Sequence, residues 1–222
     1  MTDRPLFSGR SFAAFLFDMD GTILTSIASA ERVWSLWAAK HGLDVSAFLP
    51  TIHGVRTVET IARLNLPGVD PEAEANAIMR AEMEDVSDIA PIAGAAVFLA
   101  ALPRERWAIV TSAPRALAER RIAAAGLPLP PLLIAAEDVE QGKPAPDCFL
   151  LGARRLGVAA ADCLVFEDTR AGLTAADAAG ASALVITATH AKPLDVRHPQ
   201  HASYEGLSVR ATATGLAVFE RS

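Results

Sequence analysis

The sequence is poor in cysteine, and this excludes two classes of protein. Only two cysteines, Cys148 and Cys163, occur in 222 residues, and they form no CxxC pair. Small secreted domains are usually held together by several disulfides, and structural zinc sites use closely spaced cysteine pairs. We therefore expect both cysteines to be small buried residues and the protein to work in the reducing cytoplasm.

The chain also lacks a basic surface and a long apolar segment. It has 20 Lys and Arg against 26 Asp and Glu, a net charge of -6, and no local cluster of positive residues. This balance argues against nucleic acid or an anionic membrane as a partner. The longest apolar stretch, at 92–102, is too short to span a bilayer, and the N-terminal residues do not form a signal peptide. We expect a small molecule to be bound at a local site, with monomer and homodimer both left open.

Five short apolar runs predict a parallel sheet. They show no polar alternation, as is typical of strands covered on both faces. They are FAAFLF at 12–17, WAIVT at 107–111, PLLIA at 131–135, CLVFE at 163–167 and ALVIT at 183–187. Helical segments alternate with them at 114–125, 146–156 and 170–179, which predicts a doubly wound α/β fold. Two further strands are expected near the end of the chain, at 203–210 and 215–219.

Residues 26–89 show helical patterns and no strand signal. Trp34 and Trp37 lie at helical spacing among apolar neighbours, and a second helix is predicted at 71–85. Aromatic residues at this spacing usually pack in a core, so we interpret the tryptophan pair as core and not as a ligand platform. The domain prediction is a core formed by residues 1–25 and 90–222, with residues 26–89 as a helical insert.

Polar residues gather where the predicted strands end. In a doubly wound sheet, ligands bind beyond the carboxyl ends of the strands. The residues expected there are Asp18 and Asp20 after the first strand, Thr111 and Ser112 after the second, Lys143 between the third and fourth, and Glu167 and Asp168 after the fourth. Four remote segments thus bring carboxylates, hydroxyls and one lysine to a single edge.

This set of side chains suits phosphoryl transfer, in which a protein mainly positions groups and stabilises charge. Converging carboxylates repel one another unless a cation lies among them, and oxygen ligands suit Mg²⁺. Asp18 can then attack phosphorus and form an aspartyl-phosphate, while Asp20 exchanges a proton with the leaving oxygen and with water. Lys143 and the region of Thr111 and Ser112 can hold the phosphate oxygens.

The motifs DMDGT, IVTS, GKPAPD and VFEDTRAG, in this order, resemble the four signature motifs of the haloacid dehalogenase superfamily. The resemblance implies a Rossmann-like core with an inserted helical cap domain. It also implies a role for each motif residue: Asp18 as nucleophile, Asp20 as acid and base, Thr111 and Lys143 as phosphate binders, Asp18, Asp168 and the Asp20 carbonyl as Mg²⁺ ligands, and Glu167 as the residue that positions the metal or its water.

Longer segments, among them ERVWSLWAAKHGL and IHGVRTVETIA, look like sugar phosphatases and glycerol phosphate or deoxyglucose phosphate phosphatases of this superfamily. The resemblance implies a Mg²⁺-dependent phosphatase of small sugar or polyol phosphates. Residues of the cap select the substrate in such enzymes, so Arg56, and less strongly His53 and Thr57, are expected to contact it. An alternative for Arg56 is that it only braces the cap helices.

Other functions remain as alternatives. A phosphosugar mutase of this superfamily would carry a cap histidine near position 30, where this chain has Ala30. A dehalogenase would lack the second acid of the first motif, which is Asp20 here. A phosphoglycolate-type phosphatase, and a non-catalytic sensor of phosphorylated ligands on the same fold, are the remaining candidates.

Overall fold

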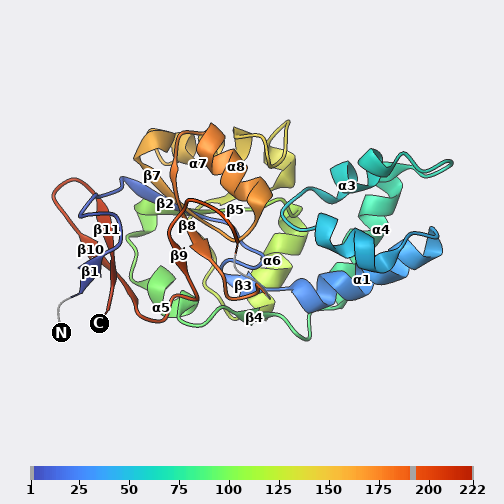
Figure 1. The fold of residues 1–222 in the computed structure, drawn as a ribbon, viewed down its shortest axis with the longest axis horizontal. Helices are drawn as coiled ribbons and strands as arrows, with labels where there is room; N and C mark the ends of the chain where they lie inside the picture. Colours follow the sequence, from blue (N-terminus) through green and yellow to red (C-terminus); the bar gives the residue numbers. More distant parts are fainter. Residues whose placement is uncertain (1–2, 191–193, 222) are drawn as a thin grey trace.

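A six-stranded parallel sheet forms the centre of the computed structural model, which describes residues 3–190 and 194–221 (Figure 1). Its strand order is β6-β5-β2-β7-β8-β9. The strands are β2 (Ala14–Phe17), β5 (Trp107–Val110), β6 (Leu133–Ile134), β7 (Cys163–Glu167), β8 (Ser182–Ile186) and β9 (Gln200–His201). The predicted doubly wound α/β class is confirmed, and the strand order turns back at β2.

Helices cover both faces of this sheet. They are α5 (Ala95–Ala100) and α6 (Arg115–Ala124) on one face and α7 (Asp147–Arg155) and α8 (Arg170–Ala178) on the other (Figure 1). Alternate residues of β2 enter different cores: Phe15 and Phe17 pack toward α5 and α6, whereas Ala14 and Leu16 pack toward α7 and α8. This explains the unbroken apolar runs, because neither face of the sheet contacts water.

The two ends of the chain form a second, smaller sheet. Its strands are antiparallel in the order β1-β11-β10, with β1 at Arg4–Pro5, β10 at Leu207–Ala211 and β11 at Leu216–Glu220. The strand predicted at 203–210 begins only at Leu207, because residues 203–206 form a turn in which Gly206 has a φ of +78°. A left-handed residue of this kind interrupts a strand.

The segment between residues 26 and 89 is helical and has its own hydrophobic cluster. Its helices are α1 (Ile27–Lys40), α2 (Val45–Phe48), α3 (Thr57–Leu64) and α4 (Pro71–Glu84). They extend from one end of the sheet, opposite the small antiparallel sheet (Figure 1). Trp34 and Trp37 are 3% and 6% exposed and pack with Phe48, Ile61 and Ile78, so both belong to this core as expected. Trp34 in addition lines a cavity at the end of the sheet.

Two short strands connect this helical insert to the sheet. They are β3 (Leu24–Thr25) and β4 (Ala90–Pro91), and they pair in antiparallel fashion. The chain therefore leaves and re-enters the core at neighbouring points, and we infer that residues 26–89 form the inserted unit. Short 3-10 turns complete the element list: η1 (Leu49–Thr51), η2 (Arg104–Arg106), η3 (Ala136–Asp138) and η4 (Ala160–Asp162).

Within residues 3–190 and 194–221, every helix is too short or too polar to cross a bilayer.

The cluster inside the helical insert predicts a difference between two aliphatic truncations. Ile61 is 1% exposed in α3, whereas Leu36 is 77% exposed on α1. We expect Ile61→Ala to lower the free energy of unfolding by about 2–5 kcal/mol through lost burial and a cavity. Leu36→Ala should change it by less than about 0.5 kcal/mol. Denaturant titration of both variants measures this, and equal effects would contradict a separate core in the insert.

Candidate active site

The site is built where the central strands end. β2 lies between β5 and β7, and the register pairs Phe17 with Phe166. Asp18 continues this pairing, since its backbone N–H donates to the Phe166 carbonyl at 2.9 Å. The Asp18 and Glu167 side chains are consequently held at the same edge by a rigid parallel ladder.

Lys143 is buried between these two acids. Its Nζ donates to Asp18 Oδ1 at 2.5 Å and to Glu167 Oε1 at 2.7 Å, and its side chain is 1% exposed. Burial alone would lower the pKa of Lys143, but the carboxylates of Asp18 and Glu167 outweigh that effect and raise it. Lys143 is therefore a fixed ammonium aimed at Asp18.

Asp18, Glu167 and Asp168 form a buried acidic cluster. Each offers a carboxylate oxygen, and these three oxygens lie within 4.8 Å of one another. Burial, with a further contribution from Glu167, raises the pKa of Asp18 to about 7 despite Lys143. Burial also raises the pKa of Asp168 well above its ordinary value, and the charges of Glu167 and Asp18 add to the effect.

Three carboxylates share this volume with one ammonium group, so Lys143 cannot balance the charge of the cluster when all three are ionised. An oxygen-only donor set with surplus negative charge fits a hard divalent cation. The donor set of Asp18, Glu167 and Asp168 therefore fits such a cation, and the individual ligands, including Asp20, stay a prediction.

Two glycines permit the close packing of the acids. A Cβ atom at Gly21, which has a φ of +85°, would lie 2.0 Å from Asp168 Oδ2. A Cβ atom at Gly172 would lie 1.6 Å from Glu167 Oε1. Both distances are far shorter than van der Waals contact, so the acids can occupy these places only beside glycine.

The second oxygen of Glu167 is fully engaged. Glu167 Oε2 accepts hydrogen bonds from the backbone N–H groups of Asp168 and Thr169, at 2.7 and 2.6 Å, and from the Thr169 hydroxyl at 3.0 Å. Thr169 also caps α8 by accepting from the Gly172 N–H. Glu167 is thus oriented by the start of α8 and presents its other oxygen to Lys143.

Asp20 lies apart from the acidic cluster. Ser26 Oγ donates to its Oδ1 at 2.5 Å, and Arg121 Nη1 donates to its Oδ2 at 3.1 Å. Arg121 in turn lies 3.3 Å from Glu82 Oε1 of α4. Sequence reasoning missed Ser26, Glu82 and Arg121. The available signal for Arg121 was its spacing from Leu117, which places a charge on the buried face of α6.

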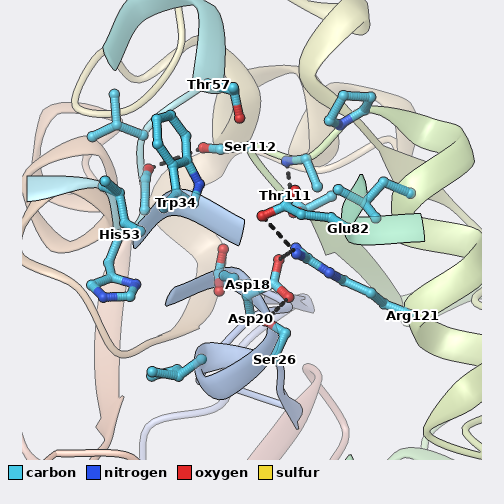
Figure 2. Close-up of a pocket in the computed structure, with 18 of the residues that line it drawn as sticks. Asp18, Asp20, Ser26, Trp34, His53, Thr57, Glu82, Thr111, Ser112 and Arg121 are labelled. Carbon is cyan, nitrogen blue, oxygen red and sulfur yellow. Dashed lines mark hydrogen bonds and ion pairs between the residues drawn. The ribbon is translucent and has the colours of Figure 1, made fainter. Parts of the chain in front are cut away.

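A cavity of about 80 Å³ opens between these groups and the helical insert. Asp18, Asp20, Thr111 and Asp168 line it from the core side. Trp34, His53 and Thr57 of the insert line the rest of it (Figure 2). The predicted cap residues His53 and Thr57 therefore line the same cavity as Asp18, Asp20, Thr111, Ser112 and Asp168.

Two polar groups of the strand-end loop shape the core side of this cavity. Thr111 Oγ1 accepts a hydrogen bond from the Ala113 N–H at 3.1 Å, which leaves its hydroxyl hydrogen available for a ligand. Ser112 Oγ donates to the Gly54 carbonyl at 3.0 Å (Figure 2). Ser112, expected to bind substrate, thus also joins the core to the insert.

Arg56 lies outside this cavity and bridges the insert and the core. Its Nε donates to Glu59 at 2.7 Å, and its Nη groups donate to the carbonyls of Val139 at 3.2 Å and Glu140 at 2.7 Å. It lines a neighbouring groove together with Thr57 and Glu137. These contacts are those of the bracing alternative, and a direct contact of Arg56 with substrate stays a prediction.

Comparison with known proteins gives phosphatases as relatives. The chain is 39% identical to hexitol phosphatase A of Escherichia coli (strain K12) over 149 residues, which are 65% of this chain and 69% of the relative. It is 32% identical to glycerol-1-phosphate phosphohydrolase 2 of Saccharomyces cerevisiae over 163 residues, 71% of this chain and 64% of the relative. The chain thus spans about two thirds of the length of these relatives.

A solved structure and a family model agree with this result. A hydrolase from Pseudomonas syringae superposes with a TM-score of 0.70 at 25% identity, over 79% of this chain and 84% of that one. The model of the haloacid dehalogenase-like hydrolases matches residues 12–180, a range that contains all four motifs and the buried acids. The resemblance inferred from the motifs is confirmed, and the chain belongs to the haloacid dehalogenase-like hydrolase family.

Proposed function

We propose that this hydrolase is a Mg²⁺-dependent phosphatase that releases phosphate from small sugar or polyol monophosphates in the cytoplasm. The observation that carries the proposal is the Asp18 carboxylate, fixed by Lys143 within a buried acidic cluster at the end of β2. The names of the relatives give the substrate class, because one acts on hexitol phosphates and another on glycerol 1-phosphate.

In the proposed reaction, a carboxylate oxygen of Asp18 attacks phosphorus, and the bond from phosphorus to the ester oxygen breaks. Asp20 gives a proton to that leaving oxygen, so the alcohol departs neutral. Water then attacks the aspartyl-phosphate, its proton returns to Asp20, and Asp18 is regenerated with inorganic phosphate as product. Lys143 and Thr111 hold phosphate oxygens during both displacements.

Mg²⁺, when bound by Asp18, Asp168 and the Asp20 carbonyl, supplies positive charge to the phosphoryl oxygens. The chain itself keeps water out during the first displacement. Trp34, His53 and Gly54 of the helical insert stand over the acids and line the cavity. At about 80 Å³ the cavity is smaller than the ~300 Å³ typical of ligand pockets, so we expect the insert to move when an ester enters.

Hydrolysis is favoured over a mutase reaction by the residue at position 30. Ala30 lines the cavity and offers no proton donor or acceptor toward a sugar hydroxyl. A mutase must return the phosphoryl group to a second hydroxyl before water reaches the aspartyl-phosphate.

Replacement of the nucleophile tests the reaction. We expect Asp18→Asn to lower turnover by roughly 10³-fold or more, since an amide oxygen is a poor nucleophile. The fold should persist, because asparagine keeps the shape and Lys143 keeps Glu167 as its partner. Phosphate release and thermal melting measure the two effects. The matched control is Asp162→Asn at the opposite end of β7, where the side chain is exposed. Retained turnover in Asp18→Asn would contradict the mechanism and favour a passive binding role for Asp18.

Metal removal tests the acidic cluster. We expect EDTA to reduce phosphate release to background and added Mg²⁺ to restore it, because the carboxylates of Asp18 and Asp168 are expected to hold the cation. Asp168→Asn should need a higher Mg²⁺ concentration for half-maximal activity. Titration of Mg²⁺ into the chelated enzyme measures both. Full activity in EDTA would refute the metal assignment.

A substrate panel tests the substrate class. With Mg²⁺ present we expect kcat/KM for hexitol, glycerol and hexose monophosphates to exceed that for phosphoglycolate by at least ~10-fold, as in a site selective for hydroxylated esters. Phosphate release across the panel measures this. A preference for phosphoglycolate would favour that alternative, and conversion between glucose phosphate isomers without phosphate release would favour a mutase.

A further inference from the structure

Three charged side chains connect the helical insert to Asp20. Glu82 lies near the end of α4, Arg121 lies on α6, and Asp20 follows β2. Arg121 Nη1 donates to Asp20 Oδ2 at 3.1 Å, and Arg121 Nη2 lies 3.3 Å from Glu82 Oε1. Figure 2 shows the guanidinium between the two carboxylates, with Asp20 on the floor of the cavity.

Most of this arrangement is buried, and removing charged groups from water costs folding free energy. The side chains of Arg121 and Glu82 are each 5% exposed, and that of Asp20 is 29% exposed. Apolar residues of similar size often give equal or greater stability than a buried ion pair. Within the described residues, Arg121 Nε has no hydrogen-bond partner, and Nη2 forms an ion pair with Glu82 without hydrogen-bond geometry. A contribution to stability alone therefore does not explain a buried arginine at position 121.

The contacts of Asp20 show what Arg121 contributes. Each oxygen of the Asp20 carboxylate has one partner: Ser26 at the start of α1 holds Oδ1, and Arg121 holds Oδ2. The plane of the carboxylate is thereby fixed from two sides. A donor of a proton must point at its acceptor, so loss of either partner affects the direction of transfer.

We propose that Arg121 is a positioning residue that orients Asp20 toward the leaving oxygen, and that Glu82 of α4 holds Arg121 for this task. The inference rests on the proposed function, because it takes Asp20 as the proton donor. Its consequence is that the orientation of Asp20 depends on the seating of α4 against α6. The insert then contributes to proton transfer without touching the leaving group.

Leaving-group dependence separates this role from others. An ester of a strongly basic alcohol needs a proton as its bond to phosphorus breaks, whereas p-nitrophenolate leaves without one. The ratio kcat/KM covers the steps through formation of the aspartyl-phosphate, so it isolates the first displacement. Substituted phenyl phosphates vary the basicity of the leaving group at nearly constant size and carry no polyol hydroxyls.

The experiment measures kcat/KM of the full chain with Mg²⁺ on this aryl series and on glycerol 1-phosphate. We expect Arg121→Met to lower kcat/KM by less than ~3-fold for p-nitrophenyl phosphate and by ~10-fold or more for the most basic leaving groups. The dependence on leaving-group basicity thus becomes steeper. Arg121→Lys should restore part of the loss, and Glu82→Gln should give a smaller steepening.

Arg120→Met is the matched control. Arg120 is exposed on the same helix and donates to the Met83 carbonyl of α4 at 3.3 Å, so it tests α4–α6 contact without touching Asp20. Its dependence on leaving-group basicity should equal that of the unaltered chain. If Arg121→Met does not fold, Arg121→Lys and Glu82→Gln provide the same readout.

Two results would overturn the inference. An equal loss across the aryl series in the Arg121 variants would mean a structural role only. A loss confined to glycerol 1-phosphate, with an unchanged aryl series, would mean that Arg121 binds substrate hydroxyls. Absence of phosphate release by the unaltered chain from every ester would instead refute the proposed function, and is thus distinguishable from both.

Discussion

Repulsion among buried carboxylates is the constraint that organises this molecule. Asp18, Glu167 and Asp168 stand within one small volume, and burial raises the pKa of Asp18 and Asp168. Flexible loops would let such groups move apart into water. Here the parallel ladder between β2 and β7 opposes that separation, because the Asp18 N–H extends the ladder by donating to the Phe166 carbonyl. The apolar layers on both faces of the sheet thus hold charge together at its edge.

The same constraint explains the roles of the small residues and of the lysine. Gly21 and Gly172 leave room for Asp168 and Glu167, and no other residue type could occupy those two positions without displacing an acid. Lys143 comes from a loop outside the strands and neutralises part of the charge. The remaining negative charge makes this edge suitable for a divalent cation.

Much of this could be predicted from the sequence because it depends on local signals. The apolar runs at β2, β5, β7 and β8 and the polar residues after them fix both the fold class and the edge at which Asp18, Lys143 and Asp168 meet. The strand at 203–210 was predicted to begin too early, because the turn that Gly206 marks was not taken as its start. The contacts of Arg56 with Val139 and Glu140 could not be predicted, since they join segments about 80 residues apart.

The pair formed by Glu82 and Arg121 could not be predicted from the sequence either, because it joins two helices that are remote in the chain. Glu82 lies in the last turn of a helix rich in acids, and Arg121 belongs to a run of two arginines on α6. Only the packing of α4 against α6 distinguishes Glu82 from Glu84 and Arg121 from Arg120. The side chain of Asp18 is therefore held by core residues, whereas that of Asp20 is held by Arg121, which pairs with Glu82 of the insert. Under the proposed function, the nucleophile would be held by the core at all times, whereas the orientation of the proton donor would depend on the contact between α4 of the insert and α6 of the core.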